Sequence, residues 1–234
     1  MFDKDTIWHL ATEDGVIEYL GALFFLITSI LFFILFRKSD TGNNFFQVIR
    51  TKRNIFYLIL GIMFLFAAGE EISWCQRIFD ITVPNEYKIL NVQKELNIHN
   101  LYIFRQDFYG FHFNMVSLFT TFSLVFCFCV PLLDKFVPLF SRHQSQIALP
   151  IVPIEIGIFF PLSYLVYNVS KYYILQPELI KPHSEIRESI WAFLFLIIAV
   201  HWMLERRASD SSRDIMAPRP FAKKSLGFSS NRVN

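Results

Sequence analysis

Two adjacent glutamates, Glu70 and Glu71, stand where a long apolar run ends. A charged side chain inside a bilayer costs roughly 2.5 to more than 10 kcal/mol, so such residues are paired, protonated or functional. Trp74 and Arg77 share a helical face with Glu70. The pattern predicts a catalytic set of Glu70, Glu71 and Arg77, with a carboxylate as general base or metal ligand and the arginine holding an anion. An ion pair of Glu70 with Arg77 or Arg105 is the structural alternative.

A dense polar segment follows at residues 91–100. If it is helical, Asn91, Glu95 and His99 form a stripe with a spacing of four. Glutamate and histidine on one helix face can bind one metal ion. Together with Glu71 they predict a divalent metal site of Glu71, Glu95 and His99, for which zinc, manganese or iron are conceivable. An interfacial amphipathic helix with a solvated polar face is the alternative.

Amides and one indole make up most of the other polar side chains here. They are more numerous than solubility requires, and they predict a hydrogen-bonded network with the carboxylates or with a ligand. The expected members are Trp74, Gln76, Asn91, Gln93, Asn97 and Asn100. Other polar groups precede later apolar runs and can join the same face, namely Arg105, Asp107, His112, Asn114, His183, Glu185, Arg187 and Glu188.

Two segments of this region, GEEISWCQR and NVQKELNIHN, resemble a motif of uncharacterised bacterial multi-pass membrane proteins. The motif reads Glu-Glu-x-Ser-Trp-Gly-Gln-Arg, then Asn-x-Gln-x-Glu-x-Asn-x-His-Asn. The likeness covers about thirty residues, and Cys75 stands where the motif has glycine. It implies a bacterial membrane protein and no particular activity.

The composition predicts a membrane protein. Of 234 residues, 53% are hydrophobic and 18% aromatic, which is more apolar than an ordinary soluble domain. A formal net charge of +2 gives no field that would attract nucleic acid, so membrane lipids are the expected partners. We expect one all-α domain over residues 1–207 and a disordered cytoplasmic tail over residues 208–234.

Five apolar runs approach the roughly 20 residues that cross a hydrocarbon core of about 30 Å. Because lipid offers the backbone no hydrogen bonds, each run is expected to be a helix. The runs lie at residues 16–36, 55–74, 112–133, 147–169 and 189–204. Acidic residues precede the first run, which favours an uncleaved helix over a signal peptide. The prediction is a polytopic bundle of about five transmembrane helices.

Basic residues predict its orientation. In a five-span arrangement, fourteen of the 22 lysines and arginines fall on one side, most of them close to span ends. The positive-inside rule then places the N-terminus outside and the C-terminus in the cytoplasm. Glu70 and Glu71 lie near the outer end of the second span, and the polar segment after them is an outer-face re-entrant or interfacial segment. The expected location is a bacterial inner membrane.

Glu155 is an acid inside the fourth run, after Pro150 and Pro153. A helix that begins at residue 147 would place it about 12 Å inward, near the middle of the membrane. The prolines should bend that helix, and an acid beside a bend is typical of a proton or cation site in a transporter. A protonated glutamate bonded to a neighbouring helix is the alternative.

Two functions from different classes follow. The first is an outer-face enzyme that uses a metal to act on a lipid or lipid-linked group. The second is a non-catalytic assembly factor or small transporter, in which the same residues form a structural ion-pair network. The sequence leaves both open, and the metal content of the purified protein distinguishes them.

Overall fold

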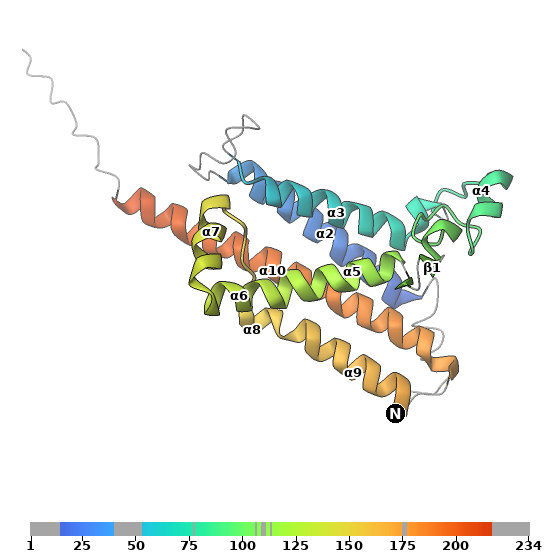
Figure 1. Ribbon diagram of the computed structural model, residues 1–234. Helices are drawn as coiled ribbons and strands as arrows, with labels where there is room; N and C mark the ends of the chain where they lie inside the picture. The colour runs from blue at the N-terminus through green and yellow to red at the C-terminus, as the bar shows by residue number, and fades with distance from the viewer. Residues whose placement is uncertain are drawn as a thin grey trace, which may run out of the picture.

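The computed structural model describes residues 15–39, 53–76, 78–105, 107–108, 111–112, 114–174 and 177–216. Within them the chain is helical apart from short turns and one small hairpin (Figure 1). The α-helices are α2 (Val16–Lys38), α3 (Ile55–Glu71), α4 (Asn85–Leu90), α5 (Met115–Leu124), α6 (Val130–Phe136), α7 (Pro138–Ile147), α8 (Ile154–Gly157), α9 (Phe159–Tyr173) and α10 (Ile180–Met216). Short 3-10 turns are η2 (Ser73–Cys75), η3 (Tyr102–Arg105) and η5 (Pro177–Leu179); η4 (Val125–Cys129) is a π-helical segment between α5 and α6. Strands β1 (Asp107–Phe108) and β2 (Phe111–His112) pair antiparallel.

Three helices in the described part of the chain are long and apolar enough to cross a membrane. They are Val16–Lys38, Met115–Phe136 and Ile180–Asp210. This finding, with the helical architecture, confirms the all-helical class and is consistent with an integral membrane protein. α3 has 17 residues, at the lower limit of the length that crosses a membrane, and α9 has 15, which is below it. Five spans and their orientation therefore stay predictions.

The long helices lie side by side with roughly aligned axes (Figure 1). α2 packs along both α3 and α10. α4 and β1 lie at one end of the bundle, which we call the cap end, and α7 lies at the other end (Figure 1). The polar segment predicted to do chemistry is therefore gathered at a single end of the molecule.

Aromatic rings join four helices in the core. The Phe64 ring of α3 lies 4.6 Å from Phe195 of α10 and 5.6 Å from Phe32 of α2, between centroids. Phe195 in turn lies 4.9 Å from Phe160 of α9. Tilted and offset ring pairs at such distances contribute about 0.5–1.5 kcal/mol beyond the area that they bury. The rings thus fasten α2, α3, α9 and α10 together.

Small residues bring helices into close contact where rings would not fit. The Ser29 hydroxyl donates to the Gly61 carbonyl at 2.7 Å, which ties α2 to α3. A Cβ on Gly157 would lie 2.0 Å from the carbonyl oxygen of Cys127, so only glycine lets α8 approach η4 this closely. Membrane helices commonly pack through such small residues.

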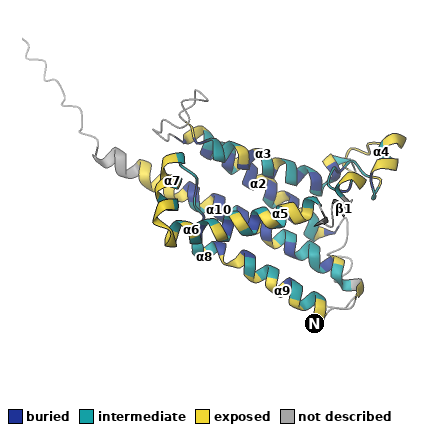
Figure 2. Cartoon of the chain, viewed as in Figure 1, coloured by how far each residue is buried: buried dark blue, intermediate teal, exposed yellow. Residues whose placement is uncertain are grey.

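Large apolar side chains cover much of the outside. Dark blue faces turn toward the bundle interior, while yellow marks the outer faces and α7 (Figure 2). Ile59, Leu118 and Leu165 are about half exposed or more. An exposed apolar surface of this extent is typical of a protein surrounded by hydrocarbon.

The fourth apolar run does not begin as a helix. α7 ends at Ile147, the chain continues without helix through Pro150, and α8 begins at Ile154. Glu155 is therefore exposed in the first turn of α8, where a negative charge interacts favourably with the helix dipole. Its predicted position half-way along a membrane helix is wrong. That position required a helix from residue 147 onward, and the prolines keep the residues before Ile154 out of a helix.

The fifth run belongs to a longer helix than expected. α10 starts at Ile180, which brings Arg187 and Glu188 onto the helix, and continues to Met216. Near its end, Arg206 pairs with Asp210 at 3.9 Å with a spacing of four. The expectation of disorder from residue 208 is therefore wrong for residues 208–216, and the remainder of the predicted tail lies outside the described residues.

Candidate functional site

The chain turns sharply where α3 ends. Ser73, Trp74 and Cys75 have φ values of 45°, 53° and 62°, in the left-handed region. This turn sends Trp74 back over α3, where a Cβ on Gly69 would lie 2.9 Å from the indole ring. The missing side chain of Gly69 thus gives Trp74 its position. We call residues 72–76 and 78–101, which follow from this turn, the cap.

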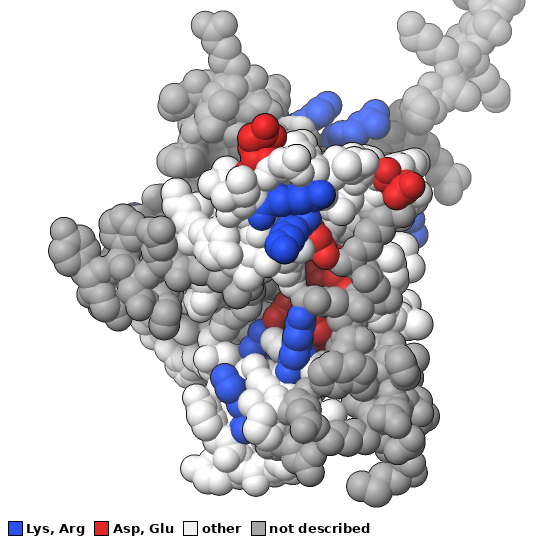
Figure 3. All heavy atoms as spheres, turned by 90° about the vertical axis from the view of Figure 1, so that its right-hand side faces the viewer, with Lys and Arg blue, Asp and Glu red and all other residues white. Residues whose placement is uncertain are grey.

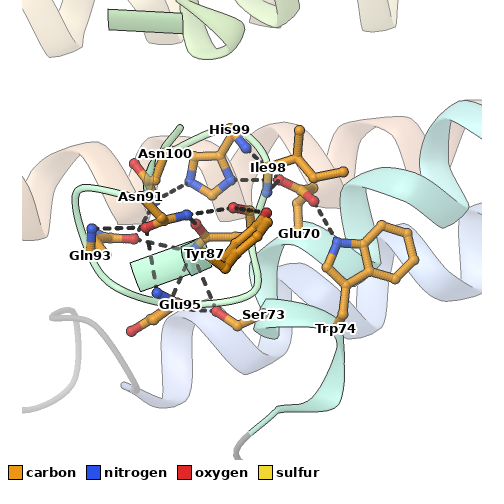
Figure 4. Close-up of polar contacts among 11 residues, drawn as sticks. Glu70, Ser73, Trp74, Tyr87, Asn91, Gln93, Glu95, Ile98, His99 and Asn100 are labelled. Atoms are coloured by element: carbon orange, nitrogen blue, oxygen red, sulfur yellow. Dashed lines mark hydrogen bonds and ion pairs between the residues drawn. The ribbon is translucent and has the colours of Figure 1, made fainter. Parts of the chain in front are cut away.

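Glu70 is the anchor of the cap (Figure 4). Its Oε2 accepts the backbone N–H groups of Ile98 and His99, both at 2.7 Å. The same oxygen lies 3.0 Å from Nδ1 of His99, and Oε1 accepts from the Trp74 indole nitrogen at 2.5 Å. Glu70 is only 6% exposed, and both of its carboxylate oxygens accept hydrogen bonds from the protein. Such a carboxylate holds structure together.

Residues 91–101 are not helical. They form turns that a bridge between Asn91 and Leu101 closes. Asn91 Oδ1 accepts the backbone N–H of Gln93 at 2.9 Å, and its Nδ2 donates to the carbonyl of Asn97 at 2.6 Å. Asparagine side chains compete with helical hydrogen bonds in this way. The helical stripe predicted for this segment is therefore wrong.

Side chains from η2 hold the loop from its other side. Glu95 Oε2 accepts from the Ser73 hydroxyl at 2.6 Å and from Asn97 Nδ2 at 3.1 Å. Gln76 Oε1 accepts the backbone N–H of Leu96 at 2.8 Å. The amides of the cap therefore serve the protein's own backbone and side chains, as the predicted network requires.

His99 is held at both ring nitrogens. Nδ1 lies 3.0 Å from Glu70 Oε2, and Nε2 lies 2.8 Å from Asn100 Nδ2. The Asn100 amide also donates to Gln93 Oε1. With Asn100 as donor, Nε2 accepts and Nδ1 carries the proton that points at Glu70. Binding a metal through His99 would require breaking one of these two contacts.

Tyr87 closes the network from α4. Its hydroxyl donates to the carbonyl oxygen of Asn97 at 3.1 Å. Burial, and after it the nearby Glu70 carboxylate, raise the pKa of Tyr87 above its ordinary value. The phenol therefore stays protonated and remains a donor over the physiological pH range.

A cavity of about 370 Å³ lies beside the cap, between α3, α5 and α10. We call it the α3–α5 cavity. Most of its wall is apolar, and the charged and imidazole groups on it come from the end of α3, from the cap and from α10. It is lined by Phe25, Met63, Phe66, Ala67, Glu70, Glu71, His99, Met115, Val116, Leu118, Phe119, Thr120, Phe122, Arg187, Glu188 and Trp191.

Glu71 contributes to this cavity rather than to the cap network. Among the described residues, no hydrogen bond or ion pair joins its side chain to a partner. Arg187 Nη2 instead pairs with Glu188 at 2.9 Å. Four further carboxylates act electrostatically on Glu71, and they are those of Glu18, Glu70, Glu185 and Glu188. The polar wall of the cavity is thus acidic on balance.

Figure 3 looks onto the cap end of the molecule. Some Asp and Glu side chains are set back in a hollow near the middle of this face, others lie on the surface above it, and Lys and Arg side chains stand nearer the viewer than the recessed acids (Figure 3). Some of the acidic side chains at the cap end are therefore recessed. A ligand that reached them would leave bulk water.

The predicted site residues divide into three groups. The cap network joins Glu70, Trp74, Gln76, Asn91, Gln93, Glu95, Asn97, His99 and Asn100. Glu71 lines the cavity, and Arg77 lies outside the described residues. Glu71, Glu95 and His99 do not gather around one point; in the part of the chain that the structure describes, no three His, Cys, Asp or Glu side chains lie close enough to hold a metal.

Some cavity residues were absent from the predicted site. The sequence marks Arg187 and Glu188 only as polar groups before the fifth run, and the start of α10 brings them beside Glu71. The signal that could have identified them is that they directly precede the apolar run and can continue its helix. The apolar wall, including Phe119 and Met63, carried no signal, because its residues come from helices distant in the chain.

Comparison of the chain with protein-family models, with curated protein sequences and with solved structures finds no match.

Proposed function

We propose that this is an integral membrane protein that binds a lipid or a lipid-linked molecule in the α3–α5 cavity. The hydrocarbon part of the ligand would lie along the apolar wall, against residues such as Met63 and Phe119. Its polar part would lie beside Glu71 and the Glu188–Arg187 pair. The observation that carries the proposal is the contrast within one cavity between an apolar wall and a charged end.

The dimensions of the cavity support a small-molecule ligand. Its volume of about 370 Å³ falls within the roughly 300–1,000 Å³ of ligand sites. Such sites are mostly apolar and have a few polar groups that fix orientation. Val116 and Leu118 line the cavity and are also partly exposed on the outside of α5, so a ligand could enter from the hydrocarbon phase.

The charge of the polar end favours a ligand that donates hydrogen bonds. Glu71 is surrounded by other carboxylates, and the positive charge of Arg187 is already paired with Glu188. A hydroxyl, amine or ammonium head group would find acceptors there, whereas an anionic head group would be repelled. We therefore propose a neutral or cationic head group.

The topology that we propose has five spans, with the N-terminus and the cap outside and the C-terminus in the cytoplasm of a bacterial inner membrane. The distribution of basic residues supports this orientation. The arrangement of the helices supports the number of spans, because α3 and α9 run alongside the three long helices (Figure 1). In this orientation the cavity lies near the outer leaflet.

The cap favours a binding role over metal-assisted catalysis. Its carboxylates and imidazole are engaged with one another and with backbone groups, and no metal-binding group forms among the described residues. A non-catalytic transporter or assembly factor with a lipid ligand is consistent with this geometry. In that role the cap acts as a rigid support at the rim of the cavity.

Filling the cavity tests the proposal. Ala67 lines the cavity, so Ala67→Phe should occupy part of its volume, whereas Ile62→Phe on the same helix adds a ring to an exposed outer face. Mass spectrometry of lipids retained by protein released from native membranes should show a bound lipid in the natural protein and in Ile62→Phe. The same lipid should be lost or strongly reduced in Ala67→Phe. Equal retention in all three proteins would exclude the cavity as its site.

A further inference from the structure

A second hollow lies between α9 and α10, and it is lined by no residue of the cap. We call it the α9–α10 groove; its volume is about 310 Å³. Leu162, Val166 and Ile190 form part of its wall and are 50%, 53% and 44% exposed on the outside of the bundle. The groove is therefore open to whatever surrounds the helices. It is lined by Phe159, Leu162, Ser163, Val166, Tyr167, His183, Ile186, Arg187, Ile190 and Leu194.

Two buried nitrogen atoms of residues that line this groove have no hydrogen-bond partner in the described part of the chain. They are Nε2 of His183 and Nε of Arg187. The Arg187 side chain is only 8% exposed, so water reaches it poorly. Leaving a buried donor without an acceptor is unfavourable, and native proteins rarely do so without an unobserved partner.

Other polar groups around the groove already have partners. The Ser163 hydroxyl accepts from the Trp191 indole at 2.7 Å and donates to the Phe160 carbonyl at 3.0 Å. Arg187 Nη2 pairs with Glu188. The buried donors without a partner are the Arg187 Nε–H and, in one tautomer, the His183 Nε2–H.

Tyr167 holds both groups in place. The His183 ring stacks on the Tyr167 ring, 5.4 Å between centroids and 19° between planes. The Arg187 guanidinium carbon lies 4.4 Å from the Tyr167 centroid, a cation–π contact. The two nitrogens are thus oriented before any ligand arrives, which reduces the entropy lost on binding.

From these observations we infer that the α9–α10 groove binds an acyl chain that ends in a carbonyl or carboxylate oxygen. The oxygen accepts from Arg187 Nε–H and His183 Nε2–H, and the chain lies along Leu162, Val166 and Ile190. An oxygen acceptor is required because arginine has no acceptor to offer. A multiply charged head group does not fit, since Glu188 already neutralises Arg187. A fatty acid and the ester of a membrane glycerolipid share this chemistry.

Photoreactive probes test the inference in full-length protein in lipid bilayers. One arm uses a fatty acid with a diazirine in its chain, and the other uses a phosphatidylcholine with the same diazirine acyl chain. Peptide mapping should place the label of at least one probe on α9 and α10 residues of the groove. Labelling by the fatty acid alone assigns a free carboxylate, and labelling by the phospholipid assigns an ester carbonyl.

Two variants separate the groove from general lipid contact. His183→Phe keeps a ring on Tyr167 and removes one donor, so half-maximal labelling should need about tenfold more probe. Val166→Trp fills the groove and should abolish labelling there, whereas Leu165→Trp, on an exposed position outside it, should not. Ala67→Phe in the other cavity should also leave groove labelling unchanged, which keeps this test independent of the proposed function.

Three outcomes would overturn the inference. The first is no groove labelling by either probe, in which case water satisfies the two nitrogens. The second is labelling that is equally strong on other outer helix faces, because that indicates bulk lipid. The third is unchanged labelling in both His183→Phe and Val166→Trp.

Discussion

Glu70 and Glu71 are neighbours in the chain with opposite surroundings. Both oxygens of Glu70 accept hydrogen bonds from the cap, including two backbone N–H groups. Glu71 lines a mostly apolar cavity, where the charged groups that act on it electrostatically are other carboxylates. Consecutive residues on a helix point about 100° apart, so one turn of α3 serves both regions.

The comparison separates a structural acid from a ligand-facing one. A carboxylate whose oxygens accept all their hydrogen bonds from the protein stabilises the fold, and it has few acceptor sites left for a ligand. An acid that faces a cavity without a partner destabilises the empty protein and gains most when a ligand arrives. The predictions below test this division, beginning with the largest effect.

Removing the Glu70 carboxylate should be the most damaging change. Glu70→Ala leaves the N–H groups of Ile98 and His99 and the indole N–H of Trp74 without an acceptor. Each unsatisfied donor costs about 1–3 kcal/mol, so we expect a loss of roughly 3 kcal/mol or more in the free energy of unfolding. Thermal unfolding in detergent measures it. Glu70→Gln keeps one acceptor oxygen and should lose less; an Ala variant as stable as the natural protein would contradict the anchoring role.

Glu71→Gln should leave stability intact and weaken ligand binding, in contrast to Glu70→Ala. The change replaces a carboxyl that would repel the surrounding carboxylates whenever it ionised, and it breaks no hydrogen bond among the described residues, so stability should stay the same or rise by up to about 1 kcal/mol. Binding of a head group in the cavity should weaken by about tenfold or more, because an amide holds a donor or cation less strongly. Lipid retention and thermal unfolding in the same preparation check both statements. A stability loss as large as that of Glu70→Ala would erase the distinction.

Gly69→Ala should disturb the cap without touching a carboxylate. Alanine normally stabilises a helix by about 1 kcal/mol over glycine. Here its Cβ would lie 2.9 Å from the Trp74 ring, which must move away from Glu70. We expect a net loss of about 1–2 kcal/mol in the free energy of unfolding. In a Trp74→Leu background the ring is gone, so the same change should instead stabilise, and a double-mutant cycle measures the difference.

The sequence predicted the helical membrane class and the composition of the cap from local information. Apolar runs between polar segments suffice for the first, and amides beside the paired acids at the end of α3 suffice for the second. The loop backbone could not be predicted in the same way. Asn91 can support a helical stripe or a set of turns, and the choice depends on contacts with Asn97 and with the distant Glu70.

Two other features depended on information that is not local. The position of Glu155 changes with the residue at which a helix starts, and the prolines before it moved that start from residue 147 to Ile154. The α3–α5 cavity needs Phe25, Phe119 and Trp191 from three helices far apart in the chain. Their packing cannot be inferred from spacing in one sequence.

The smallest expected effect concerns Cys75, which has a φ of 62°. A side chain in the left-handed region costs about 1–2 kcal/mol, and glycine avoids that cost while losing roughly 0.5–1 kcal/mol through the entropy of the unfolded chain. Cys75→Gly should therefore stabilise the protein by about 0.5–1 kcal/mol, whereas Cys75→Ala, which keeps the Cβ, should not. Thermal unfolding of the two variants side by side measures the difference. The motif that this segment resembles has glycine at the same place, so a gain in the glycine variant alone would tie that preference to the turn carrying Trp74 back to Glu70. Equal stability of the two variants would show that the turn is not strained at Cys75, and the cap would then need another reason for its shape.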